Sequence, residues 1–122
     1  MHKLLSSKSL FSIFLSVLFI TSCSNNKDSV PAGYIEPSKM TEIFVDMQLV
    51  EAVLLHLQQK GTDANAYRKV LYDKIFEKHK IKKEDFDKSL NYYSRNNMKL
   101  LDKIYADVIT SLSQKQSQIK TQ

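Results

Sequence analysis

The chain has 122 residues, which is enough for one small domain. Hydrophobic residues make up 43% and charged residues 25%, with two Gly and two Pro, so the composition is globular rather than fibrous or disordered. The formal charge of +5 includes Lys3 and Lys8 of an N-terminal leader, which leaves +3 for the rest. This small net charge, together with the lack of a motif that combines aromatic and basic residues, argues against nucleic-acid binding. The single cysteine excludes an internal disulfide and a multi-cysteine metal site.

The first 22 residues are predicted to form a lipoprotein signal peptide. Lys3 and Lys8 form a positive n-region, and the stretch from Leu10 to Ile20 contains only Ser12 and Ser16 as polar residues. As a helix rising about 1.5 Å per residue, this stretch would span roughly 16 Å, which is about half of a ~30 Å hydrocarbon core. It is therefore too short to cross a membrane and fits a signal-peptide h-region.

The leader is followed by Ile20-Thr21-Ser22-Cys23, which resembles the bacterial lipobox. That resemblance implies a diacylglyceryl group on the Cys23 sulfur and usually a third acyl chain on its amine. At about 0.8 kcal/mol per buried CH₂, two or more chains hold a protein durably. We therefore expect Cys23 to be the lipid attachment site of a protein tethered to a membrane surface. An ordinary buried cysteine or an uncleaved anchor is the alternative.

Residues 23–36 are expected to form a flexible, lipidated tether. The stretch after Cys23 is polar and rich in turn formers, with Pro31 and Gly33 as breakers. Its 13 residues reach at most about 43 Å when fully extended.

Residues 37–112 are predicted to be an all-α domain, a small antiparallel bundle of three to four helices. Gly61 is the only glycine in this stretch, and no proline follows Pro37. Apolar residues recur at spacings of three and four without sustained alternation, which indicates helices. The short connections favour antiparallel neighbours. Residues 113–122 are expected to form a frayed polar tail.

The first helix is predicted to begin at Pro37-Ser38, with Ser38 as its N-cap, and to end near Gln59. It carries apolar residues on two sides, which is typical of a central helix with several neighbours. The main stripe consists of Met40, Ile43, Phe44, Met47, Val50, Leu54 and Leu57. The second patch consists of Val45, Leu49, Ala52 and Val53.

Three further helices are expected, over about 64–79, over about 84–93, and after a break at 94–97, with the apolar pattern of the last one ending at Leu112. Thr62-Asp63 caps the first of them, and Ser94 to Asn97 separates the last two, although one continuous helix is an alternative. The predicted inward residues are Tyr67, Leu71, Tyr72, Ile75 and Phe76; Phe86, Leu90 and Tyr93; and Leu101, Ile104, Tyr105, Val108, Ile109 and Leu112.

Glu51 and Arg68 both fall on apolar sides of their helices. In an antiparallel hairpin that turns near 60–62, Arg68 lies within one helical turn of Glu51. We therefore predict a partly buried pair across the hairpin. A purely structural role that sets packing register is favoured over acid–base chemistry.

Glu42 and Asp46 are four residues apart, but no histidine falls at a matching step. A solvated acidic edge is therefore favoured over a metal site, and no cofactor beyond the covalent lipid is expected. His56 and His79 are interpreted as ordinary helix-end residues.

Two surface features are candidate partner contacts. Lys80, Lys82 and Lys83, next to Lys78, form a basic corner that would suit lipid phosphates, although a solvated helix connection is the alternative. Tyr92 cannot share a face with its neighbour Tyr93, which follows the inward stripe, so Tyr92 is expected to point aside.

A set of mostly aromatic and aliphatic positions carries a family resemblance: Pro37, Met40, Asp46, Glu51-Ala52, Tyr72, Ile75-Phe76, Phe86-Asp87-Lys88-Ser89-Leu90, Tyr92-Tyr93, Leu101, Ile104-Tyr105 and Val108-Ile109. On these positions, residues 37–112 resemble small lipoproteins of Gram-negative bacteria that carry the domain-of-unknown-function family numbered 4296. The resemblance implies a lipobox leader and a periplasm-facing location, but no catalytic residues. Members often have Gly before the isoleucine at the second helix stop, where this chain has Lys80.

The expected protein is a membrane-anchored cell-envelope lipoprotein with a helical protein-interaction module, and not an enzyme. Its partner would be another envelope protein. A carrier of an apolar ligand and a small envelope hydrolase that uses Glu51 are the alternatives. An exposed apolar patch would favour the interaction module, whereas a large dry cavity or a concave site around Glu51 would favour its rivals.

Overall fold

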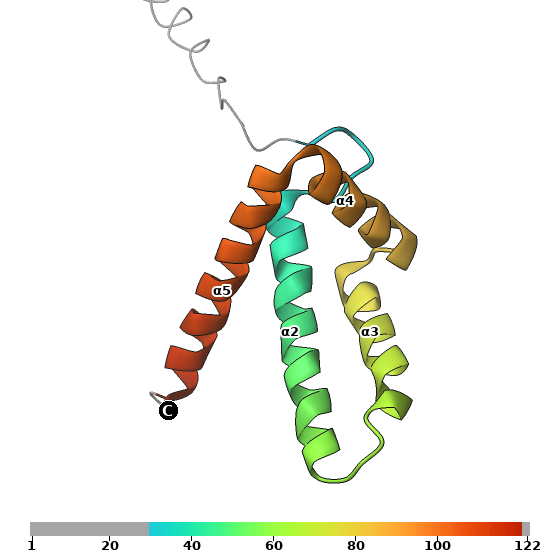
Figure 1. Ribbon diagram of the computed structural model, residues 1–122, viewed down its shortest axis with the longest axis vertical. Coiled ribbons are helices and arrows are strands. Elements are labelled where there is room, and N and C mark those ends of the chain that lie inside the picture. Colours follow the sequence, from blue (N-terminus) through green and yellow to red (C-terminus); the bar gives the residue numbers. More distant parts are fainter. Residues whose placement is uncertain (1–29, 121–122) are drawn as a thin grey trace, which may run out of the picture.

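The computed structural model describes residues 30–120, whose regular secondary structure is entirely helical. The helices are α2 (Pro37–Gln59), α3 (Asn65–His79), α4 (Lys83–Asn96) and α5 (Met98–Lys120) (Figure 1). The all-α expectation is confirmed. The predicted signal peptide, Cys23 and the tether as far as residue 29 lie outside the described residues.

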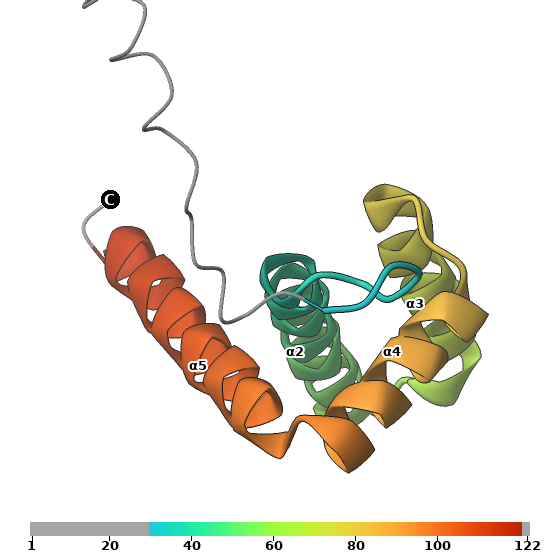
Figure 2. The ribbon, with the colours of Figure 1, turned by 90° about the horizontal axis from the view of Figure 1, so that it is seen from above.

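Helix α2 is central. It packs against α3 on one side and α5 on the other, and α4 packs against α5 (Figures 1 and 2). Aromatic contacts join these pairs into one core, because Phe44 of α2 lies against both Phe86 of α4 and Tyr105 of α5, at centroid distances of 5.5 and 5.2 Å. Phe76 of α3 contacts Phe86 as well, at 5.7 Å. All four helices therefore share one set of aromatic side chains.

The start of α2 differs from the prediction. Glu36, in extended conformation, holds the N-cap position, and Pro37 is the first helical residue. Ser38 therefore lies inside the first turn. Proline suits the first helical position, because its missing N–H would have no partner within the helix there and its fixed φ matches helical geometry. The helix ends as predicted before Lys60-Gly61, where Gly61 adopts a φ of +78°.

Helix α3 ends at a residue that adopts the left-handed conformation without being glycine. Lys80 has φ 54° and ψ 42°, its N–H bonds to the Glu77 carbonyl, and the Ile81 N–H bonds to the Phe76 carbonyl. This is the Schellman pattern that ends many helices. The chain thus makes a glycine-type stop with a lysine.

Helices α4 and α5 are separate. Asn97 leaves helical geometry at φ −148° and ψ 63°, and its side-chain oxygen accepts a hydrogen bond from the Leu100 N–H at 3.3 Å. The side chain thereby caps α5, as the asparagine-rich stretch predicted. The continuous-helix alternative is wrong.

The core contains most of the predicted inward residues but not all of them. Tyr67, Tyr105 and Ile109 were expected to face inward and are 49%, 44% and 67% exposed. They lie at the edges of their stripes, where none of the four described helices covers them. The buried apolar residues are Met40, Ile43, Val45, Met47, Leu54, Ala64, Ile75, Phe76, Phe86, Tyr93, Leu100, Leu101, Ile104 and Val108.

Two predicted boundaries need correction. The frayed tail expected at 113–122 is helical through Lys120, where the described residues end, because α5 continues without a Gly or Pro to stop it. Residues 30–36, assigned to the flexible tether, lie against the helices, with Val30 and Ile35 packed on the core. We call residues 30–36 the strap. None of the described helices is long and apolar enough to cross a membrane.

Candidate functional site

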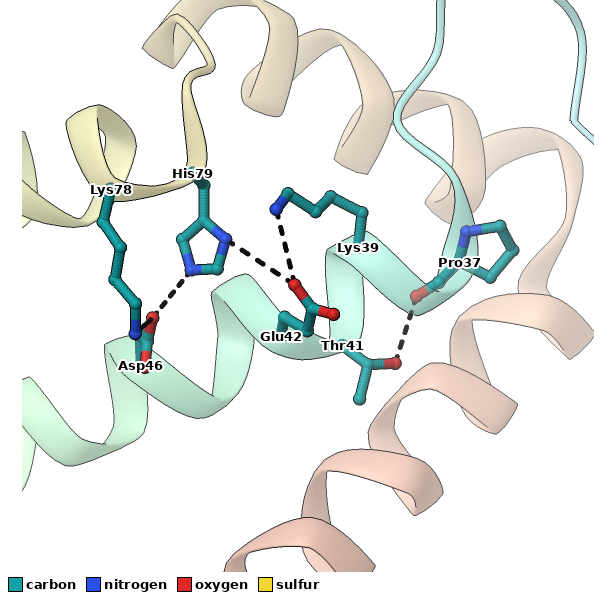
Figure 3. A network of polar contacts seen from close by, with 7 residues as sticks. All are labelled: Pro37, Lys39, Thr41, Glu42, Asp46, Lys78 and His79. Carbon is teal, nitrogen blue, oxygen red and sulfur yellow. Dashed lines mark hydrogen bonds and ion pairs between the residues drawn. The ribbon is translucent and has the colours of Figure 1, made fainter.

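The Asp46–His79 clasp, which also includes Glu42 and Lys78, joins α2 to the last turn of α3 (Figure 3). His79 Nε2 lies 2.6 Å from Asp46 Oδ2, and Lys78 Nζ donates to the same oxygen at 2.7 Å. The His79 side chain is only 5% exposed and that of Asp46 18% exposed. Two α3 side chains, His79 and Lys78, therefore meet at the largely buried carboxylate of Asp46.

The electrostatics of Asp46 follow from these neighbours. Burial opposes its ionisation, but hydrogen bonds from Lys78 and His79 and their charges outweigh that effect and lower the pKa of Asp46 below its ordinary value. The Asp46 carboxylate is therefore ionised at neutral pH and holds both α3 side chains.

The clasp borders a hollow of about 250 Å³ that also includes Thr41, Ser111 and Lys115. Both His79 nitrogens face carboxylates, since Nδ1 lies 3.9 Å from Glu42 Oε2. The Thr41 hydroxyl donates instead to the Pro37 carbonyl at 3.1 Å. The imidazole is thus held between two acids, an arrangement that fastens helices together.

Glu51 and Arg68 are brought together as an ion pair across the α2–α3 hairpin. The Tyr72 hydroxyl donates to the same Glu51 oxygen at 2.6 Å, and this hydrogen bond is the main cause of the lowered pKa of Glu51, with Arg68 contributing. Burial and the bond to Glu51 raise the pKa of Tyr72. The pair lies nearer the surface than expected, with Arg68 and Glu51 side chains 47% and 38% exposed.

The strap is fastened to α4 through its backbone. The Ile35 N–H donates to Ser89 Oγ at 2.9 Å, and the Tyr93 hydroxyl donates to the Ile35 carbonyl at 2.6 Å. Ser89 and Tyr93 are fully buried. Burial, with the charges of Glu36 and Tyr92, raises the pKa of Tyr93 to about 12. Two buried side chains therefore satisfy both backbone groups of one strap residue.

Tyr92, a candidate partner contact, is partly buried and packs against the strap. Its ring lies 4.3 Å from that of Tyr34 in the strap. Lys88 completes this contact, because its Nζ lies 4.8 Å from the Tyr34 ring centroid and donates to the Gly33 carbonyl at 3.1 Å. The side chain that is predicted to point aside therefore has one of its contacts within the chain's own strap.

The predicted basic corner is exposed, but acidic side chains lie among its lysines. Lys80, Lys82 and Lys83 all lie on the surface, between α3 and the start of α4. Lys83 pairs with Asp87, which raises the pKa of Lys83. Lys80 is engaged through its backbone as the helix stop.

An apolar surface remains open between α2 and α5. Leu49, Val53 and Ile119 are 42%, 51% and 76% exposed. Leu49 and Ile119 line the same hollow of about 330 Å³, with Lys115 and Gln118, and Val53 lies one turn further along α2. We call Leu49, Val53 and Ile119 the α2–α5 seam.

Sequence reasoning missed His79, Ser89 and the exposure of the seam. The hairpin register that placed Arg68 near Glu51 also places residue 46 opposite about residue 76, one turn from His79. The same register therefore could have predicted the contact between Asp46 and His79. Ser89 carried no local signal, because its partner Ile35 is 54 residues away in the chain.

Among the comparisons with known proteins, a family model matches most of the chain. The family model described as "Domain of unknown function (DUF4296)" matches residues 31–118, which include the strap from Pro31 and nearly all of the four helices. No curated protein and no solved structure matches the chain. Because the family model covers well over half of the sequence, the chain belongs to the DUF4296 family.

Proposed function

We propose that the protein is a lipid-anchored adaptor of the cell envelope, which faces the periplasm and binds another envelope protein through the α2–α5 seam. The lipid would be attached to Cys23. The observation that carries the proposal is that α2 is apolar on two sides, while only part of its second side is covered.

The side chains of the second apolar patch of α2 become more exposed toward the C-terminal end of the helix. Val45 is 6% exposed, but Leu49 and Val53, one and two turns further on, are 42% and 51% exposed. Figure 1 shows why, since α5 diverges from α2 toward its C-terminal end. Removing apolar surface from water is worth about 25 cal/mol per Å², so a partner that covers these side chains would gain binding free energy.

The form of the seam suits an amphipathic helix as the partner element. Leu49 and Val53 follow each other at a spacing of four, and Ile119 stands across the hollow on α5. A helix laid between α2 and α5 would place its apolar side chains at matching intervals. Lys115, on the rim, favours an acidic residue beside that apolar face.

The two rival functions have less support. The Glu51 oxygen that an envelope hydrolase would need accepts hydrogen bonds from both Arg68 and Tyr72. The hollows near it, of about 700 Å³ between α2 and α3 and 670 Å³ between α3 and α4, are open surface grooves. An apolar-ligand carrier would call for an enclosed space instead.

Site-specific photocrosslinking in intact cells tests the adaptor. A photoreactive residue in place of Leu49 or Val53 is expected to capture one discrete envelope protein, and Leu49→Asp in a chain labelled at Val53 should abolish that capture. Val70, which is 54% exposed on α3, is the matched control position. Recovery of only lipid-sized adducts at the seam, or equal capture at Val70, would contradict the proposal.

The anchor is tested separately by intact mass spectrometry and by Cys23→Ala. The mature protein is expected to begin at Cys23 and to carry acyl chains, and Cys23→Ala should release the chain from membranes or leave an uncleaved precursor. A bare Cys23 thiol with the leader still attached would disprove the anchor.

A further inference from the structure

The corner between α4 and α5 carries positive charge and an exposed apolar side chain. Arg95 and Lys99, which flank Met98 in the sequence, are exposed, and Met98 is itself 55% exposed. We call Arg95, Met98 and Lys99 the basic corner tip. Within residues 30–120, neither Arg95 nor Lys99 is held in an ion pair.

The surrounding sequence contains no compensating acid. Between Asp87 and Asp102 there is no Asp or Glu, whereas Lys88, Arg95 and Lys99 fall in that interval. The lysine-rich connection between α3 and α4 differs, because its four lysines are matched by four acids. Those eight residues are Lys78, Lys80, Lys82 and Lys83, and Glu77, Glu84, Asp85 and Asp87.

The tip lies at the end of the molecule where the chain from Cys23 arrives. Figure 1 places the α4–α5 corner and the strap at the same end, opposite the loop that joins α2 to α3. The strap is pinned there by Ser89 and Tyr93 of α4. Glu36 is the one acid in the strap, and Lys39 follows it in the first turn of α2.

Chain length then limits which surface can reach a bilayer. From Cys23 to Val30 there are seven residues, which extend to at most about 25 Å. Helix α2, with 23 residues, is roughly 34 Å long and runs away from the strap. A lipid on Cys23 would therefore hold the strap end closest to the membrane.

We propose that the basic corner tip is a membrane-contact surface that docks on anionic phospholipid, with Met98 entering the headgroup region and Arg95 and Lys99 facing lipid phosphates. This inference rests on the proposed lipid anchor. Cations near an anionic surface and an apolar side chain between them are the features of interfacial binding. Docking at this end leaves the α2–α5 seam, toward the far ends of α2 and α5, clear of the bilayer for a partner.

Tryptophan fluorescence tests the orientation, because the chain has no tryptophan of its own. The full lipidated chain with Met98→Trp is reconstituted in vesicles of phosphatidylcholine and phosphatidylglycerol, and a brominated phospholipid serves as quencher. Val70→Trp is the matched control, since Val70 is 54% exposed and lies on α3. We expect blue-shifted emission and at least about twofold quenching for Met98→Trp and none for Val70→Trp.

A second variant tests the charges. Arg95→Glu with Lys99→Glu in the Met98→Trp background is expected to remove the quenching, as is replacement of phosphatidylglycerol by phosphatidylcholine. Equal quenching at both tryptophan positions, no quenching at Met98→Trp, or quenching that survives the charge reversal would overturn the inference. Vesicle flotation separates the two proposals: a chain that floats without quenching retains its anchor but lacks this docking, whereas a chain that does not float overturns both.

Discussion

His79 Nε2, in the last turn of α3, lies 2.6 Å from Asp46 Oδ2 in the middle of α2. The imidazole is 5% exposed, and its other nitrogen faces Glu42 at 3.9 Å. This contact closes one end of the α2–α3 interface, and the Glu51–Arg68 pair lies toward the other end. The central helix is thus fastened to α3 at two points along its length.

His79→Ala is expected to destabilise the domain by about 1–3 kcal/mol, because it leaves the partly buried Asp46 without one of its hydrogen-bond partners. Urea unfolding followed by circular dichroism measures the change. His56→Ala, at an exposed position of α2, is the control and should stay within about 0.5 kcal/mol of the unaltered protein. If His79→Ala changed the free energy of unfolding no more than His56→Ala, the clasp would contribute nothing to stability.

Acid should weaken the domain through Asp46 and Glu51. Their pKa values are lowered in the folded state, so at acid pH the unfolded chain binds more protons than the folded chain. The free energy of unfolding therefore decreases as the pH falls. The contribution is complete above the ordinary pKa values of about 4 and is lost below them. Thermal unfolding between pH 6 and about pH 2.5 measures the slope.

Asp46→Asn and Glu51→Gln provide the check on that assignment. Each is expected to lower stability at neutral pH and to flatten its dependence on pH in the acid range. If both variants kept the full slope, other carboxylates would account for the acid sensitivity.

Ser89→Ala is expected to loosen the strap. Ser89 Oγ accepts the Ile35 N–H and donates to the Asp85 carbonyl at 2.7 Å, so its removal leaves a backbone N–H unpaired. Hydrogen exchange at the Ile35 amide should accelerate at least tenfold. Ser94→Ala is the control, because Ser94 Oγ donates only to the Asn91 carbonyl of its own helix. An unchanged Ile35 amide would contradict the strap contact.

Lys80→Gly is expected to stabilise the domain by about 1 kcal/mol. Lys80 adopts the left-handed conformation, which costs a residue with a Cβ roughly 1–2 kcal/mol and costs glycine almost nothing beyond chain entropy. Chemical unfolding measures the gain, and Lys80→Ala, which removes the charge but keeps the Cβ, should give none.

Gly61→Ala is the converse of that substitution. Gly61 has φ +78° and open space around the position of a Cβ, so the cost of alanine there is conformational alone. A loss of about 1 kcal/mol is expected. A stabilising alanine at Gly61 would refute the backbone argument at both helix stops.

Local patterns determined the helices themselves. Local patterns of this kind are the spacing of apolar residues, Pro37, the Lys60-Gly61 stop and the capping Asn97. They predicted four separate helices and bounds close to those of α2 and α3, but α4 and α5 both extend further than predicted. The Glu51–Arg68 contact followed from the register of a single short hairpin. Family membership likewise followed from the sequence of positions along the chain.

Tertiary structure alone decided which of those residues work together. Ile35 and Ser89 meet across 54 residues, and Tyr92 is covered by Tyr34, because the strap folds back over α4. The divergence of α5 leaves Leu49 and Val53 exposed, although their pattern matches that of buried Val45. Periodicity reports that a helix face is apolar, but whether that face is covered depends on the crossing angles of helices far apart in the chain.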